Sequence, residues 1–244
     1  AALSIAGCTS GTGTICSQEY NGTSWTTGGN LINARKWFAG AGTQNSALAF
    51  GGRSPSPNSS LSCTEEYDGS TWTVGGALSQ GVYAQAGAGT QNAALSIGGD
   101  QSPSSCTQEY NGASWSAGGS LSVGRFRMAG AGAQNSAVVF GGTPGCKSDT
   151  EEYNGASWST GCVLPVGMIQ MAGAGQDSCT ALSFGGQSND GVLKATQAYN
   201  PSPVYCTNLS TTTDGAVILS KVLLASYADD AAAASGGVPV GGLY

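Results

Sequence analysis

Short apolar runs separated by glycine-rich turns dominate the chain, and this pattern predicts strands rather than helices. Four of these runs end in a glycine pair, the last being Ala-Leu-Ser-Phe-Gly-Gly from Ala181 to Gly186. Segments such as Thr-Glu-Glu-Tyr alternate with the period of two expected of a half-buried strand. Each is followed by Asn-Gly or Asp-Gly, a pair favoured in β-hairpin turns. The chain is therefore expected to be built from short antiparallel strands.

These elements recur as a unit of about 45 residues. Each unit runs from a Tyr-Asn/Asp-Gly-x-x-Trp phrase through a small-residue Ala-Gly-Ala-Gly run and a Gln-Asn turn to an apolar strand and a glycine pair. Such self-similarity is the signature of a repeat architecture. The repeated structural positions are Trp25, Trp72, Trp115 and Trp158; Tyr20, Tyr67, Tyr110 and Tyr153; and Gly51, Gly52, Gly98, Gly99, Gly141, Gly142, Gly185 and Gly186.

The Ala-Gly-Ala-Gly run suits the innermost strand of a blade, where sheets converge on an axis and larger side chains would collide. Four short strands per unit make one blade of a β-propeller. We predict an all-β propeller over residues 1–206, with five four-stranded blades at about 1–29, 30–76, 77–119, 120–162 and 163–206. The first unit lacks its Ala-Gly-Ala-Gly strand, and the fifth lacks its tryptophan, for which the strand at Val204 to Leu209 is a candidate replacement.

The glycine pair after an apolar strand, followed by a spaced Tyr and Trp, resembles the kelch repeat over roughly residues 1–205. The phrase from Tyr67 to Trp72 is similar to the Asp-box hairpin of sialidases, but its acid lies one position nearer the tryptophan. We interpret it as a structural turn. The histidine ligands of kelch-like copper oxidases are absent, because the chain has no histidine.

Residues 207–244 depart from the repeat and form a C-terminal extension, expected to serve attachment or assembly. This extension and the repeated Ala-Gly-Ala-Gly-Thr-Gln-Asn phrase resemble structural proteins of tailed bacteriophages of aquatic bacteria. The resemblance implies a fibre, spike or decoration protein at the virion surface. Its expected partners are other virion proteins, a host-surface glycan, or a second copy bound through the extension.

Charge and composition narrow the function classes. The net charge is −6 with eight scattered Lys and Arg, so the cation cluster that nucleic-acid binding requires is missing. No apolar run approaches the roughly 20 residues of a membrane span, and no signal peptide is visible at the start. Eight cysteines indicate an oxidising, extracellular setting. Without histidine or a Cys-x-x-Cys pair, we expect no metal and no other cofactor.

Bridges within a blade fit the short Cα separation of a disulfide better than bridges between blades. The candidate pairs are Cys8–Cys16, Cys146–Cys162 and Cys179–Cys206. Cys63 and Cys106 are then left free, or paired in another way.

Repeated acids at one blade position are candidates for glycoside cleavage by paired carboxylates. They are Glu19, Glu65, Glu66, Glu109, Glu151 and Glu152. A catalytic pair needs asymmetry that a repeated position does not supply, and four arginines at irregular spacing do not suggest a sialidase triad. We therefore interpret the acids as structural and expect no enzyme.

The loops that enter the Ala-Gly-Ala-Gly strands vary most and should share one rim near the axis. Their candidate binding residues are Lys36, Trp37, Tyr83, Arg125, Phe126 and Arg127. Aromatic and arginine side chains on such loops bind sugars or anchor a protein partner. Packing between blades is the alternative, and Arg35 and Arg125 at equivalent positions also suit structural salt bridges.

The non-catalytic interpretation leaves two candidate functions. The first is a virion-surface structural or adhesion protein that presents the propeller to a host surface or to other virion proteins. The second is a secreted or cell-surface lectin-like adhesin of a bacterium. A glycan-active enzyme is the third and least favoured.

Overall fold

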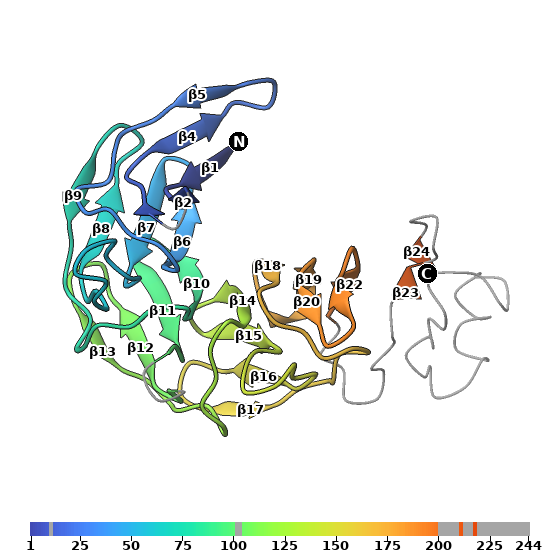
Figure 1. Cartoon of the computed structure of the whole chain (residues 1–244). Helices are drawn as coiled ribbons and strands as arrows, with labels where there is room; N and C mark the ends of the chain where they lie inside the picture. Colours follow the sequence, from blue (N-terminus) through green and yellow to red (C-terminus); the bar gives the residue numbers. More distant parts are fainter. Residues whose placement is uncertain (10–11, 101–103, 200–209, 212–216, 219–244) are drawn as a thin grey trace, which may run out of the picture.

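Five small antiparallel sheets lie side by side as blades around one axis (Figure 1). The computed structural model describes residues 1–9, 12–100, 104–199, 210–211 and 217–218. The prediction of an all-β propeller with five blades is confirmed. The candidate strand at Val204 to Leu209 lies outside the described residues. Across the described part of the chain, no helix has the length and apolar character needed to cross a membrane.

Three blades have four strands each, in sequential order from the axis outward. The second blade contains β6 (Ala39–Thr43), β7 (Ser46–Phe50), β8 (Thr64–Tyr67) and β9 (Trp72–Val74). The third contains β10 (Ala86–Thr90), β11 (Ala93–Ile97), β12 (Thr107–Tyr110) and β13 (Trp115–Ala117). The fourth contains β14 (Ala129–Ala133), β15 (Ser136–Phe140), β16 (Thr150–Tyr153) and β17 (Trp158–Thr160).

The first and fifth blades have three strands each among the described residues. The first contains β1 (Ala2–Ile5), β4 (Ser17–Tyr20) and β5 (Trp25–Thr27), and so lacks an inner strand. The fifth contains β18 (Ala172–Ala174), β19 (Leu182–Phe184) and β22 (Thr196–Ala198). Between these two end blades the arc is open (Figure 1).

Small hairpins and one turn of helix complete the described structure. The hairpins are β2 (Cys8–Thr9) with β3 (Thr12–Gly13), β20 (Gln187–Ser188) with β21 (Gly191–Val192), and β23 (Ser210–Thr211) with β24 (Val217–Ile218). A 3-10 helix at Ser178–Thr180 takes the place of the tight turn between β18 and β19, and the Asp177 side chain caps it.

Inner strands pack so closely that they require glycine. A Cβ atom added to Gly87 would lie 2.6 Å from the carbonyl oxygen of Gly40 in the preceding inner strand. The corresponding distances are 2.8 Å from Gly130 to the Gly87 oxygen and 2.6 Å from Gly173 to the Gly130 oxygen. As expected from their small side chains, these strands converge, and they do so until the backbones of neighbouring strands are in contact.

Each blade is bonded to the one before it through its third strand. From the second blade onward, the tyrosine at or directly after the end of the third strand donates a hydrogen bond from its hydroxyl to a glutamate of the preceding blade. The pairs are Tyr67–Glu19, Tyr110–Glu66 at 2.5 Å, Tyr153–Glu109 at 2.6 Å and Tyr199–Glu152 at 2.5 Å. The repeated Tyr and Glu are therefore one device for aligning neighbouring blades.

The structure corrects the expected disulfides. Cys16, Cys146 and Cys179 have free thiols, so none of the three candidate pairs forms. Cys63 and Cys106 are also free, and Cys162 is disulfide-bonded, but not to Cys146. Sequence spacing placed each candidate pair near one blade, but it could not supply the Cα separation that a bridge needs.

Candidate binding site at the rim of the propeller

Four equivalent loop residues precede the inner strands of blades two to five: Trp37, Ala84, Arg127 and Gln170. All four have a φ between 54° and 56°, in the left-handed region. A residue with a Cβ pays about 1–2 kcal/mol to adopt this conformation. Glycine would adopt it freely, and the chain has 40 glycines, yet none stands here.

Backbone hydrogen bonds join these four residues in a series around the axis. The amide of Ala84 donates to the carbonyl of Trp37 at 2.7 Å, and that of Arg127 to the carbonyl of Ala84 at 2.8 Å. Gln170 continues the series with a bond of 2.8 Å to the Arg127 carbonyl. The main chain alone makes these bonds, so the side chain at each position is free to differ between blades.

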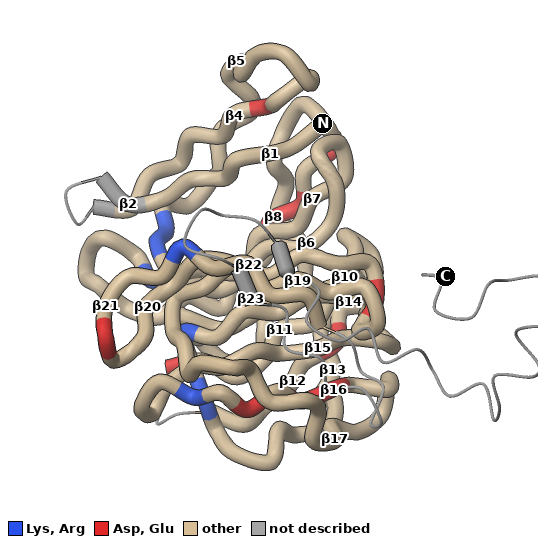
Figure 2. The backbone as a smooth tube through the Cα atoms, turned by 90° about the vertical axis from the view of Figure 1, so that its right-hand side faces the viewer, with Lys and Arg blue, Asp and Glu red and all other residues tan. Residues whose placement is uncertain are grey.

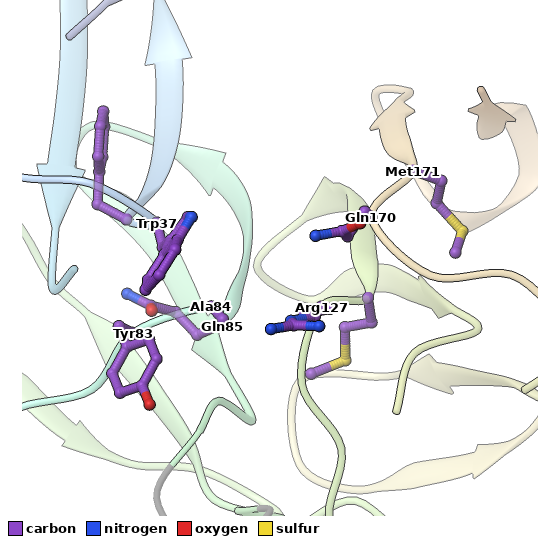
Figure 3. A pocket seen from close by; sticks show the side chains of 9 residues that line it. Trp37, Tyr83, Ala84, Gln85, Arg127, Gln170 and Met171 are labelled. Carbon is purple, nitrogen blue, oxygen red and sulfur yellow. The ribbon is translucent and has the colours of Figure 1, made fainter. Parts of the chain in front are cut away.

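A cavity of about 350 Å³ opens among these loops (Figure 3). It is lined by Trp37, Phe38, Tyr83, Ala84, Gln85, Arg127, Met128, Gln170 and Met171. Trp37 is 49% exposed, and Arg127 and Gln170 are exposed as well. Figure 3 shows the polar ends of Arg127 and Gln170 directed toward the side of the cavity that holds Trp37 and Tyr83. We call the part of the cavity lined by Trp37, Tyr83, Ala84, Arg127 and Gln170 the rim site.

Aromatic rings and cations alternate at and beside the rim site. The rings of Trp37 and Tyr83 lie 5.9 Å apart with an interplanar angle of 30°. The Lys36 ammonium lies 4.9 Å from the Trp37 ring centre, and the Arg53 guanidinium lies 4.9 Å from that of Tyr83. Figure 2 shows Lys and Arg gathered toward the face that carries the β2–β3 and β20–β21 hairpins. The protein, acidic overall, thus presents a locally basic and aromatic surface.

The hydroxyl of Tyr83 is held by a neighbouring acid. A hydrogen bond to Asp100 raises the pKa of Tyr83, and burial and the negative charge of Asp100 raise it further. Arg53 and Arg127 act in the opposite direction, which places both cations near this ring. The phenol is therefore neutral at physiological pH, and its ring is fixed by contacts at the hydroxyl and at the face.

Arg125, expected on the rim, lies elsewhere. It is 1% exposed and forms a 2.5 Å ion pair with Glu151, while it also donates to the carbonyls of Gly141 and Asp149. Arg35 makes the equivalent pair with Glu65 in the second blade. The structure thus supports the salt-bridge alternative for both arginines. A polar residue at the inner end of a propeller loop can turn inward as easily as outward, and the sequence does not distinguish the two.

The other expected rim residues come together. Lys36, Trp37, Tyr83 and Arg127 surround the cavity or its edge, and the Phe126 ring lies 5.5 Å from the Arg127 guanidinium. Sequence reasoning missed Gln170, Arg53 and Asp100. Gln170 could have been found, because it occupies the same repeat position as Trp37 and Arg127.

Repeated acids have structural partners within and between blades. Glu65 and Glu151 pair with buried arginines, and the remaining four accept hydrogen bonds from tyrosine hydroxyls, as described above. Within the described ranges, no three Asp, Glu, His or Cys side chains gather in a way that could hold a metal ion.

Comparison with known proteins shows the fold alone. No known protein family matches the sequence, and no curated protein matches it either. Among solved structures, the chain is similar to one described as "Structure of YjhT", with a TM-score of 0.68, 12% identity, and coverage of 82% of this chain and 78% of that one. The kelch type and the phage relationship receive no support from these comparisons.

The similarity to YjhT corrects one expectation. We expected no enzyme because the acids repeat and histidine is absent, and the propeller fold shared with YjhT overturns that exclusion. Folds of this kind carry many unrelated functions, so fold and repeat pattern do not exclude catalysis. What the comparisons establish is the β-propeller fold.

Proposed function

We propose that the protein is an adhesion protein that binds a glycan at the rim site. One observation carries the proposal. Trp37, Ala84, Arg127 and Gln170 share one strained backbone conformation, but their side chains differ. Strain that persists where glycine would remove it indicates that the side chains are needed. Those side chains are an aromatic ring, a methyl group, a guanidinium and a carboxamide, which suits recognition of one ligand from several sides.

The chemistry of the rim site fits a sugar. The Trp37 and Tyr83 rings offer flat apolar faces on which the C–H side of a pyranose can stack. Arg127 and Gln170 supply donors and an acceptor for hydroxyl groups, from the side of the cavity opposite the rings. A few polar groups in an otherwise apolar concave site is the usual composition of a small-ligand pocket.

The proposed setting is a virion surface, where the propeller would be displayed to a host glycan or to other virion proteins. It is supported by the resemblance of the repeat phrase and of residues 207–244 to phage structural proteins. A secreted or cell-surface bacterial adhesin would use the same rim site. Co-purification of the protein with capsid and tail proteins, or its absence from purified virions, distinguishes the two settings.

The experiment is a glycan array with the full chain, followed by calorimetric titration of the best sugar. Trp37→Ala and Arg127→Ala should each weaken binding by tenfold or more, on the order of 1.4 kcal/mol. Trp25→Ala is the matched control, because Trp25 is also an exposed tryptophan (51%) but lies on an outer strand of the first blade. Equal losses in all three variants, or no bound glycan, would contradict the proposal.

Conversion of the sugar is measured in the same samples. The bound glycan is incubated with the protein and its mass and anomeric composition are followed over time. Turnover that disappears with Arg127→Ala would assign a catalytic role to the rim site, in keeping with the shared fold of YjhT. A stable glycan would leave recognition as its function.

A further inference from the structure

The residue that follows each of the four left-handed loop residues packs into the propeller. These residues are Phe38, Gln85, Met128 and Met171 in blades two to five. Phe38 is half-buried, and Gln85, Met128 and Met171 are 6%, 5% and 8% exposed. Of these four blades, three have an apolar side chain at this position, and the third blade has a polar one.

Gln85 takes the place that methionine has in the next blade. A Cβ added to Gly51 of the preceding blade would lie 2.2 Å from the Nε2 atom of Gln85. One blade further on, a Cβ added to the equivalent Gly98 would lie 2.3 Å from the Cε atom of Met128. The two side chains thus end against the same glycine of the repeat, so the fold itself accepts methionine at this position.

The carboxamide of Gln85 is only half satisfied. Its Nε2 atom donates to the carbonyl of Phe50 at 3.0 Å. Its Oε1 atom is buried and accepts no hydrogen bond among the described residues. A buried acceptor without a partner lowers the stability of the fold, and methionine, which is similar in length, would avoid that loss. A glutamine here is explained if its oxygen has a partner outside the protein chain.

This side chain lines the cavity that contains the rim site. In the view of Figure 3, the carboxamide of Gln85 lies between the rings of Trp37 and Tyr83. The oxygen is covered in the free protein, but the terminal torsion of a glutamine side chain is soft, so the carboxamide can turn toward a donor in the cavity. A bound ligand could thus supply the missing hydrogen bond.

The rest of the lining complements an acetamido group, which has an N–H donor, a carbonyl acceptor and a methyl. Arg127 and Gln170 carry N–H donors for the carbonyl, and their polar ends point across the cavity. Met128 and Met171 offer apolar surface for the methyl. A sugar hydroxyl can also donate to a carboxamide oxygen, but it has no carbonyl and no methyl for the other groups. The combination therefore favours the acetamido group.

On the basis of the proposed glycan binding, we propose that the rim site selects an N-acetylated hexosamine. The acetamido N–H donates to the Oε1 atom of Gln85, the acetamido carbonyl accepts from Arg127, and the methyl packs against Met128. Gln85 then determines specificity, because a site with a buried polar group discriminates strongly against a ligand that leaves this group unpaired.

The fifth blade provides a matched control. Gln197 is 7% exposed, and its Oε1 atom also has no hydrogen-bond partner among the described residues. Its position is polar throughout blades two to four, where Glu65, Gln108 and Glu151 stand. Gln197 thus continues the pattern of the repeat, whereas Gln85 departs from it. Gln197 also does not line the cavity at the rim site.

The test is calorimetric titration of the full chain with four methyl glycosides, those of N-acetylglucosamine, glucose, N-acetylgalactosamine and galactose. At least one acetamido sugar should bind tenfold or more tightly than its hydroxyl counterpart. Gln85→Met should remove most of this preference. Its Tm should not fall, because the next two blades have methionine at the same position. Gln197→Met should retain the preference.

Two results would contradict this inference and leave glycan binding intact. The unaltered protein could bind sugars without any preference for the acetamido group. Gln85→Met could keep the preference, or lose it no more than Gln197→Met does, which would assign the Gln85 oxygen to an ordered water or to a structural role. If no sugar binds in the array or in the titration, the proposed function itself is contradicted, and this inference with it.

Discussion

Tyr110 of the third blade donates its hydroxyl proton to Glu66 of the second blade at 2.5 Å, and the same hydroxyl accepts from the amide of Gly76 at 3.2 Å. One side chain thus binds a carboxylate and a main-chain amide of its neighbour. The phenylalanine variant Tyr110→Phe leaves both partners without their bond at a buried interface. We expect a loss of about 1–3 kcal/mol in the free energy of unfolding, measured by urea denaturation.

Tyr20 provides the control for this variant. Its hydroxyl donates to the carbonyl of Gly22 in its own hairpin turn and, among the described residues, bonds to no other blade. Tyr20→Phe should change the unfolding free energy by less than about 0.5 kcal/mol. A similar cost for both variants would show that the interblade bond does not stabilise the propeller.

Alkaline solution should weaken the interblade bonds together. Burial and the hydrogen bond to Glu66 raise the pKa of Tyr110 to about 12, and burial and the bond to Glu152 raise that of Tyr199 to about 12. Because the unfolded chain loses these protons near pH 10 and the folded protein near pH 12, their contribution is complete below pH 10 and is lost between the two values. The Tm, measured by thermal unfolding from pH 8 to pH 12, should fall above pH 10. The fall should be smaller in Tyr110→Phe, which lacks one of the titrating hydroxyls.

Buried ion pairs make the second and fourth blades sensitive to single substitutions. Arg125→Met leaves Glu151 buried and charged without its partner, which costs about 3–5 kcal/mol. The fifth blade has Met168 and Gln197 in the equivalent places. The double variant Arg125→Met with Glu151→Gln should therefore recover most of the lost stability. Chemical denaturation of both variants, compared with Lys147→Met at the exposed 3.9 Å pair with Asp149, checks this.

Gln170 should stabilise the protein when it is replaced by glycine. Its φ of 56° is strained for a residue with a Cβ. Gln170→Gly relieves that strain but also gives the unfolded chain more conformational freedom, which opposes folding. The net increase in the free energy of unfolding should be about 0.5–1 kcal/mol. Gln170→Ala keeps the strain and should bring no gain. Both variants should weaken glycan binding in calorimetry. A loss of stability in Gln170→Gly would contradict the account of the rim site.

The architecture was readable from the sequence, because it depends on features that recur. The Ala-Gly-Ala-Gly strands, the Asn-Gly turns and the spaced Tyr and Trp all carry the same role in each copy, so the repeat itself reveals them. The incomplete first blade was also expected, since residues 1–29 contain no Ala-Gly-Ala-Gly run. The structural role of the repeated acids was foreseen, but their tyrosine partners were not, because the two residues lie 44 positions apart in neighbouring copies, as Tyr110 and Glu66 do.

The site was readable only in part. Trp37, Tyr83 and Arg127 stood out by residue type, but Arg125 stood out equally and lies in the interior. Whether an arginine turns toward the axis or into the blade depends on the acceptors around it, here two carbonyls and Glu151. Gln170 and Ala84 carry no chemical signal of their own. Their place in the rim site follows only from the repeat position that they share with Trp37 and Arg127.

Main-chain bonds hold the loops in place through the series Trp37, Ala84, Arg127 and Gln170. A mutation at one of these positions can therefore change what the surface binds without changing the fold. Because the side chains take no part in those bonds, mutation can exchange them without breaking the series. If the rim site binds the proposed glycan, selection can then change its specificity one blade at a time. The same property makes the four positions suitable for a randomised library on a fixed scaffold.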